Sequence, residues 1–114
     1  MEKVTIDVIL DWLKKSVEEK QVVDAHTWVS AGMKLNILIS EEHDKLFNLQ
    51  QAVAQLKMLR IESGDSVAKA KIAIEATNEY REMKKQEARI GMIEEAIRLA
   101  KVQSRLKSEE AKNY

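Results

Sequence analysis

The sequence contains no cysteine and no proline among its 114 residues, and only three glycines. The lack of cysteine excludes disulfides, thiolate nucleophiles and zinc-thiolate sites, which favours a cytoplasmic setting. No apolar run approaches the roughly 18 residues of a membrane-spanning helix, and the early charges at Glu2, Lys3 and Asp7 are unlike a signal peptide. We therefore expect a cytoplasmic protein that does not enter a membrane.

Aromatic residues are also scarce, at 4%, whereas hydrophobic residues make up 45% of the chain. This hydrophobic content excludes wholesale disorder, and the lack of aromatics means a core built mainly from Ile, Leu, Val, Met and Ala. Such a composition is typical of a helical bundle. The 19 basic and 19 acidic side chains cancel, so no net field attracts nucleic acid. The length predicts a single helical domain over residues 1–114.

Two helices are predicted in the first part of the chain. Thr5 is a suitable N-cap for a helix over about 5–20, in which apolar residues recur at helical spacing. Asp24 is a suitable N-cap for a second helix over about 24–62, which keeps a heptad of apolar residues. Ser40 is itself a good N-cap residue, so a break of this helix near residue 40 is the alternative.

The segment Ser63-Gly64-Asp65-Ser66 is the strongest helix-ending signal in the chain, because Gly64 suits a left-handed C-terminal position and either Asp65 or Ser66 suits the next N-cap. A third helix is predicted over about 66–107, with a frayed tail to residue 114. The predicted fold is all-α: a short N-terminal helix and a long antiparallel helical hairpin, coiled-coil-like, which assembles into a helical bundle.

When the chain folds back at Gly64, polar residues interrupt the apolar stripes of both long helices at the same height along the hairpin. A polar layer in a coiled-coil seam costs stability but fixes register and oligomer state. The alternative is a buried polar binding site. The predicted polar layer consists of Glu42, Lys45, Gln86 and Glu87.

The first helix is too short to cover the whole hairpin. Its roughly 16 residues span about 24 Å, which covers only the end far from Gly64. Apolar surface near Gly64 is then left in water unless a second hairpin covers it. We therefore expect a homo-oligomer, with a dimer favoured, that closes a four-helix bundle. The predicted interface consists of Leu46, Leu49, Val53, Leu56 and Leu59.

No catalytic, cofactor-binding or metal-binding residues are predicted. Neither His26 nor His43 has the glutamate three residues earlier that di-iron bundles require. Two acidic pairs, Glu41-x-x-Asp44 and Glu79-x-x-Glu82, have the spacing that chelates magnesium in all-helical nucleotide pyrophosphatases. In the expected hairpin the pairs lie about nine residues apart, roughly 13 Å, so one magnesium ion does not join them within a chain. A magnesium-dependent nucleotide hydrolase is our third hypothesis, and we expect no enzyme activity.

Basic residues recur at helical spacing on the third helix, at Arg98, Lys101 and Arg105. A face of this kind can follow a phosphate backbone. However, glutamates are interleaved with the basic residues, and no aromatic side chain provides a stacking platform. Nucleic-acid contact through these three residues is therefore an alternative function, not the favoured one.

Four short segments of the chain carry a resemblance, namely 25–28 (AHTW), 34–36 (KLN), 41–46 (EEHDKL) and 64–70 (GDSVAKA). These segments resemble those of small uncharacterised helical proteins from bacteriophages and prophages. This resemblance implies a bacterial or viral cytoplasmic setting and an accessory role in phage development, DNA metabolism or host takeover, and it transfers no site residues. The favoured function is a non-enzymatic, homo-oligomeric helical interaction or adapter protein with a protein partner.

Overall fold

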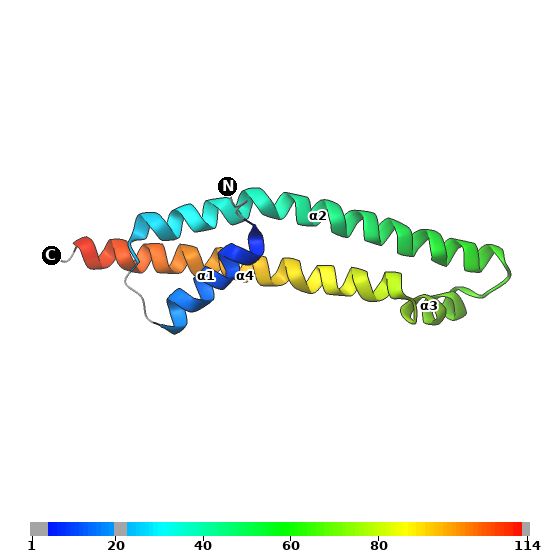
Figure 1. The fold of residues 1–114 in the computed structure, drawn as a ribbon. Helices are drawn as coiled ribbons and strands as arrows, with labels where there is room; N and C mark the ends of the chain where they lie inside the picture. The colour runs from blue at the N-terminus through cyan, green and yellow to red at the C-terminus, as the bar shows by residue number, and fades with distance from the viewer. Residues whose placement is uncertain (1–4, 20–22, 113–114) are drawn as a thin grey trace. The chain divides into compact units, whose positions relative to one another are not determined.

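The computed structural model describes residues 5–19 and 23–112. About 90% of these residues are helical, in four helices and with no strand among them (Figure 1). This share is far above the roughly one third that is usual in globular proteins. The all-α prediction, with a short first helix and a long antiparallel helix pair, is confirmed.

Helix α1 spans Ile6–Glu18 and begins where the sequence predicts. The Oγ1 atom of Thr5 accepts a hydrogen bond from the Val8 amide at 3.3 Å, which satisfies one amide that the first turn leaves unpaired. Asp7 lies in this first turn, near the positive end of the helix dipole. Lys20, the predicted last residue of this helix, lies outside the described residues.

Helix α2 is a continuous helix of 38 residues, Ala25–Glu62. The Thr27 amide and hydroxyl both donate to Oδ1 of Asp24 at 2.8 Å, and these hydrogen bonds lower the pKa of Asp24. The structure has no break near residue 40. The Ser40 hydroxyl donates to the carbonyl of Ile37 within the helix, instead of capping a new one.

The reversal after α2 is a Schellman motif, built as the sequence predicts. Gly64 has φ of 109°, which favours glycine over any residue with a side chain. The Asp65 amide donates to the Arg60 carbonyl, and the Gly64 amide donates to that of Ile61, both at 3.1 Å. The Ser66 side chain then caps the next helix by accepting from the Lys69 amide.

The predicted single helix over 66–107 is wrong, because the structure contains two helices in this region. Helix α3 spans Val67–Glu75 and helix α4 spans Asn78–Lys112. Between them, the Thr77 hydroxyl donates to the Ile74 carbonyl at 2.6 Å and accepts from the Tyr80 amide at 3.2 Å. Thr77 thus ends one helix and caps the next, since its hydroxyl competes with the helical backbone for hydrogen bonds.

The end of α4 also differs from the sequence-based expectation. The frayed tail predicted after residue 107 is helical as far as Lys112, in a segment rich in good helix formers. Residues 113 and 114 lie outside the described residues.

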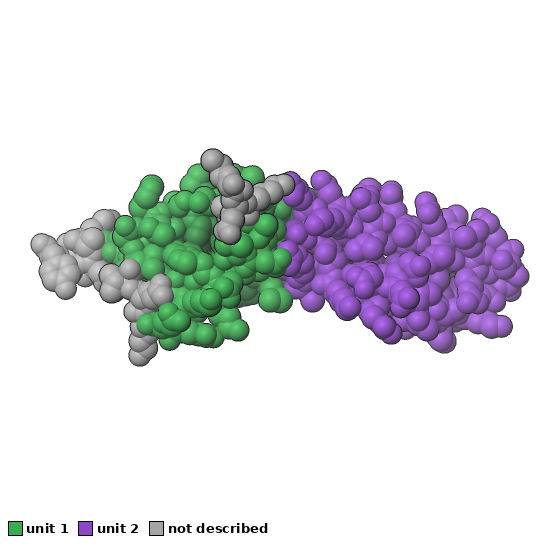
Figure 2. Space-filling model, in the orientation of Figure 1, with its two compact units in different colours: residues 1–40, 91–114 green, residues 41–90 purple. Residues whose placement is uncertain are grey.

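Contacts within the chain group into two compact units, whereas a single domain was expected from the length. Unit 1 comprises residues 1–40 and 91–114, and unit 2 comprises residues 41–90 (Figure 2). Helices α2 and α4 each contribute to both units and run antiparallel within each of them (Figure 1).

Unit 1 has a continuous hydrophobic core in which α1 packs against α2 and α4. Leu35 and Ile93 are completely buried in this core. Gly32 of α2 faces Ala100 of α4, and a Cβ atom at position 32 would lie 3.4 Å from the Cβ atom of Ala100, in van der Waals contact. Trp28 is buried, and its ring lies 5.5 Å from that of the half-buried Trp12, with the two planes tilted. The other buried core residues are Ile6, Ile9, Leu13, Val23, Ala31, Ile97 and Ala100.

Candidate functional site

Unit 2 contains a buried carboxylate, Glu42, which is only 4% exposed. The Gln86 side-chain amide donates both to Oε2 of Glu42 and to the Glu42 carbonyl, the latter at 3.0 Å. These two bonds join α2 to α4 across 44 residues of sequence. The structure therefore brings together two of the four residues of the predicted polar layer at the expected height.

Two basic side chains neutralise Glu42. The guanidinium of Arg89, on α4, lies 3.2 Å from Oε2 of Glu42, and the ammonium of Lys45 lies 3.7 Å from Oε1. Burial raises the pKa of Glu42, but the hydrogen bonds from Gln86 and Arg89 and the nearby positive charges outweigh it, so that the net pKa is lowered. The carboxylate is therefore held in its charged form.

The fourth residue of the predicted layer lies apart from this cluster. Glu87 pairs with Lys84 of its own helix at 3.2 Å, and both side chains are at least one third exposed. Arg89 takes the place that the sequence analysis gave to Glu87. The polar cluster of unit 2 is therefore Glu42, Lys45, Gln86 and Arg89.

Replacing Glu42 alone and replacing Glu42 together with Gln86 should have opposite effects on stability, because only the single substitution leaves the Gln86 amide without its side-chain acceptor. Glu42→Leu alone should lower the free energy of unfolding by about 1–3 kcal/mol, because it leaves the Gln86 amide without its side-chain acceptor. Glu42→Leu combined with Gln86→Leu should raise the melting temperature above wild type while loosening the choice of oligomer state. Arg89 tolerates this change because its side chain is 34% exposed and reaches water.

Thermal unfolding followed by circular dichroism, together with sedimentation, measures both effects. Glu87→Leu is the matched control, since this glutamate lies outside the cluster, and it should change neither quantity. If the double substitution left both stability and assembly unchanged, the cluster would have no part in fixing register.

The residues of the predicted interface are incompletely covered in the isolated chain. Leu46, Leu49, Val53 and Leu56 are half-buried, and Leu59 is 58% exposed. Among residues 41–62 of α2, all of which are described, the one buried side chain is that of Glu42. The buried apolar residues of unit 2 come instead from α3 and α4, and they are Ala70, Ile74, Met83 and Ile90.

An open groove lies in unit 2 next to this stripe. Its volume is about 310 Å³. Three of its lining side chains are apolar, namely Leu56, Leu59 and Ile74, and the others are Arg60, Ser63 and Thr77. The groove therefore presents the exposed end of the predicted interface as a hollow apolar surface, near the Gly64 turn.

A second apolar row on α2 was missed by the sequence analysis. Phe47, Met58 and Ile61 are exposed and fall on the side of the helix opposite Leu49 and Val53. Their spacing of 11 and 3 residues is helical, so the row was visible in the sequence. The row was not predicted because a soluble helix usually buries a single apolar stripe.

The three basic residues proposed for nucleic-acid contact do not form a free cationic face. The Arg98 guanidinium donates twice to Oε2 of Glu95, at 2.7 and 3.1 Å, and this pairing raises the pKa of Arg98. Lys101 and Arg105 are exposed. An arginine that is already paired with a carboxylate releases fewer counterions on binding a phosphate backbone, so this arrangement does not favour DNA or RNA.

We therefore expect no measurable affinity for random duplex or single-stranded DNA at physiological salt. Fluorescence anisotropy at about 50 and 200 mM salt measures this directly, because phosphate contacts weaken steeply over that range. The matched variant replaces Arg98, Lys101 and Arg105 by alanine and should behave as wild type. Micromolar binding that weakens with salt and disappears in this variant would promote the nucleic-acid function above the favoured one.

The acidic pairs do not combine into a metal centre in the described part of the chain. No group of three or more His, Cys, Asp or Glu side chains is placed there to hold a metal ion. Glu82 of the second pair forms an ion pair with Lys85 at 3.6 Å.

No helix of the described residues combines the length and the apolar character that crossing a bilayer requires.

Comparison with models of protein families, with curated protein sequences and with solved structures finds no match to this chain.

Proposed function

We propose that this chain is a non-enzymatic helical interaction protein that works as a homodimer, with unit 2 as its self-association surface. One observation carries the proposal. The α2 stripe of unit 2 is only partly covered in the single chain, and its end at Leu56 and Leu59, together with Ile74 of α3, lines a groove of about 310 Å³. Exposed apolar surface of this kind on a small protein marks a contact with another protein.

A second copy of the same chain suits this surface because unit 2 carries no excess of either charge. Residues 41–90 contain nine acidic and nine basic side chains. Two identical surfaces with balanced charge do not repel each other, whereas a strongly charged partner gains nothing from the contact. A two-fold arrangement also places each groove opposite the apolar side chains of the other copy.

The polar cluster gives such an assembly its register. Glu42 sits in the apolar stripe of α2, and its bonds to Gln86 and Arg89 fix the height of α4 against α2 within unit 2. A slipped pairing leaves a buried carboxylate without partners, which costs far more than a displaced leucine. Helices α2 and α4 of unit 2 therefore pair in a single register, so that every chain presents the same surface to its second copy.

Methionine oxidation tests which side of α2 is covered, because two neighbouring positions lie on different faces. Leu59→Met conserves volume and places an oxidisable probe in the groove, while the natural Met58 is 61% exposed outside it. At low protein concentration both methionines should react with peroxide at similar rates. At high concentration the rate at position 59 should fall about fivefold or more, with Met58 nearly unchanged.

Mass spectrometry of peptides from the oxidised protein gives the two rates. Protection of Met58 instead of position 59 would move the interface to the outer row of Phe47, Met58 and Ile61. Equal reactivity at all concentrations would contradict self-association altogether.

In this proposal the dimer presents surfaces to a further protein partner in the cytoplasm. An accessory role in a phage or its bacterial host follows from the sequence resemblance alone. Affinity capture with wild-type protein and with a Leu59→Asp variant, which should stay folded, tests this part, because partners of the dimer should be lost with the variant and should survive nuclease treatment.

A further inference from the structure

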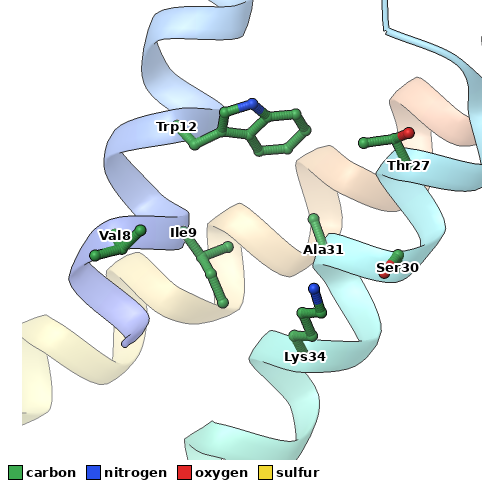
Figure 3. A pocket seen from close by; sticks show the side chains of 7 residues that line it. All are labelled: Val8, Ile9, Trp12, Thr27, Ser30, Ala31 and Lys34. Carbon is green, nitrogen blue, oxygen red and sulfur yellow. The ribbon is translucent and has the colours of Figure 1, made fainter. Parts of the chain in front are cut away.

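Unit 1 contains a second hollow, which lies between α1 and the first turns of α2. Its volume is about 260 Å³. Figure 3 shows the side chains from both helices that surround it. The lining residues are Val8, Ile9, Trp12, Thr27, Ser30, Ala31 and Lys34. All of them belong to unit 1, so this pocket is separate from the surface proposed for self-association.

The floor of the pocket is fixed by the core of unit 1. Ile9 and Ala31 are buried members of that core, and Trp12 packs against it. Figure 3 shows the Trp12 indole reaching from α1 toward Thr27 on α2. The rigid apolar floor and the flat aromatic wall suit an aliphatic or aromatic body.

The polar lining of the pocket is all on α2 and carries one charge, that of Lys34. Its side chain extends from α2 into the space between the helices (Figure 3). Among the described residues, no acidic side chain lines the pocket and none forms an ion pair with Lys34. Asp24, which precedes α2, is engaged by the amide and the hydroxyl of Thr27. The pocket therefore offers an uncompensated ammonium group, together with the hydroxyl of Ser30.

We propose that this pocket binds a small monocarboxylate with an apolar body, whose acid group pairs with Lys34 and whose body lies on Ile9, Ala31 and Trp12. The volume is below the roughly 300–1,000 Å³ of pockets for drug-sized ligands, so the ligand is small, in the range of a medium-chain fatty acid. The acid supplies the negative charge that the lining lacks. The proposal does not depend on self-association.

Octanoate is the test ligand, with 1-octanol and octylammonium as matched probes that share its chain. Isothermal titration calorimetry on the full chain should show one site for octanoate, with a Kd of about 1 mM or below. Octanol should bind about tenfold more weakly, and octylammonium should not bind measurably. Octanoate should also change the tryptophan emission, since Trp12 forms one wall.

Variants separate this site from general hydrophobic binding. Lys34→Gln should weaken octanoate about tenfold while changing octanol less than twofold, and Lys14→Gln, which removes an exposed lysine from α1 outside the pocket, should change neither. Ser30→Phe should fill the pocket and abolish binding of every probe. Ser40→Phe is the matched control at an exposed serine of the same helix.

Absence of saturable octanoate binding to the wild type would overturn the proposal. Equal effects of Lys34→Gln and Lys14→Gln would also overturn it, because Lys34 would then have no specific role. If Ser30→Phe did not fold, the pair of lysine variants would still decide the question.

Discussion

Replacing Leu49 and Leu56 together by aspartate should abolish self-association and unfold unit 2. Both side chains are half-buried on the stripe of α2, so the two substitutions place carboxylates in a largely apolar, half-buried surface. The combined cost is on the order of 5 kcal/mol or more, comparable with the whole stability of a small domain. Circular dichroism should show a loss of helix, and sedimentation should show only monomer.

A matched pair of single substitutions separates loss of association from loss of folding. Leu59→Asp lies in the groove, whereas Met58→Asp lies outside it, and the two wild-type side chains are 58% and 61% exposed. The single chain should keep its fold in both variants. We expect Leu59→Asp to weaken the dimer about 100-fold, with little effect from Met58→Asp. Equal behaviour of the two variants would mean that the groove is not the contact.

Leu35→Ala should remove about 2–5 kcal/mol from the free energy of unfolding. Leu35 is completely buried in the core of unit 1, among side chains from α1, α2 and α4, so truncation leaves a cavity. Because this core is closed within a single chain, the loss should not depend on protein concentration. Urea unfolding at two protein concentrations measures it.

Ile37→Ala is the control for this measurement, since Ile37 lies two residues away on the same helix and is 70% exposed. Its effect should stay within about 0.5 kcal/mol. An effect of Leu35→Ala that grew on dilution would show that the core of unit 1 is completed by a second chain, contrary to our description.

Four helix ends were predictable from the sequence, whereas the one at Thr77 was not. Thr5, Asp24, Gly64 and Ser66 each have a local role that depends on their own chemistry and on a few neighbours, and the structure gives them that role. Periodicity also placed Glu42 level with Glu87 and next to Gln86, its observed partner, because helix rise is constant and the register is counted from the Gly64 turn.

The break at Thr77 was not predicted, because most residues on both sides of it are good helix formers and favour a continuous helix. The adjacent Thr77 and Asn78 are both weak helix formers, and Thr77 has the same side-chain chemistry as the N-cap of α1. Whether a threonine in such a segment caps a new helix or stays inside an old one depends on tertiary packing. Here Ala70 and Ile74 bury one face of α3 in unit 2, and this is not visible in local sequence.

Arg89 was missed for a different reason. Helical spacing predicts the height of each residue along the hairpin, but it does not predict which side chains point toward the other helix. Glu87 and Arg89 are close in height but project about 200° apart on α4, so which of them meets Glu42 depends on which side of the helix faces α2, and height alone does not give this. The structure has Arg89 at 3.2 Å from Glu42 and Glu87 paired with Lys84.

Sedimentation equilibrium of the wild-type chain over a concentration range of about 1–100 µM tests self-association through unit 2 most directly. We predict a single reversible transition from the chain mass of 13.1 kDa to twice that mass, with the midpoint in the micromolar range. A compact, fully helical monomer at every concentration would contradict the account.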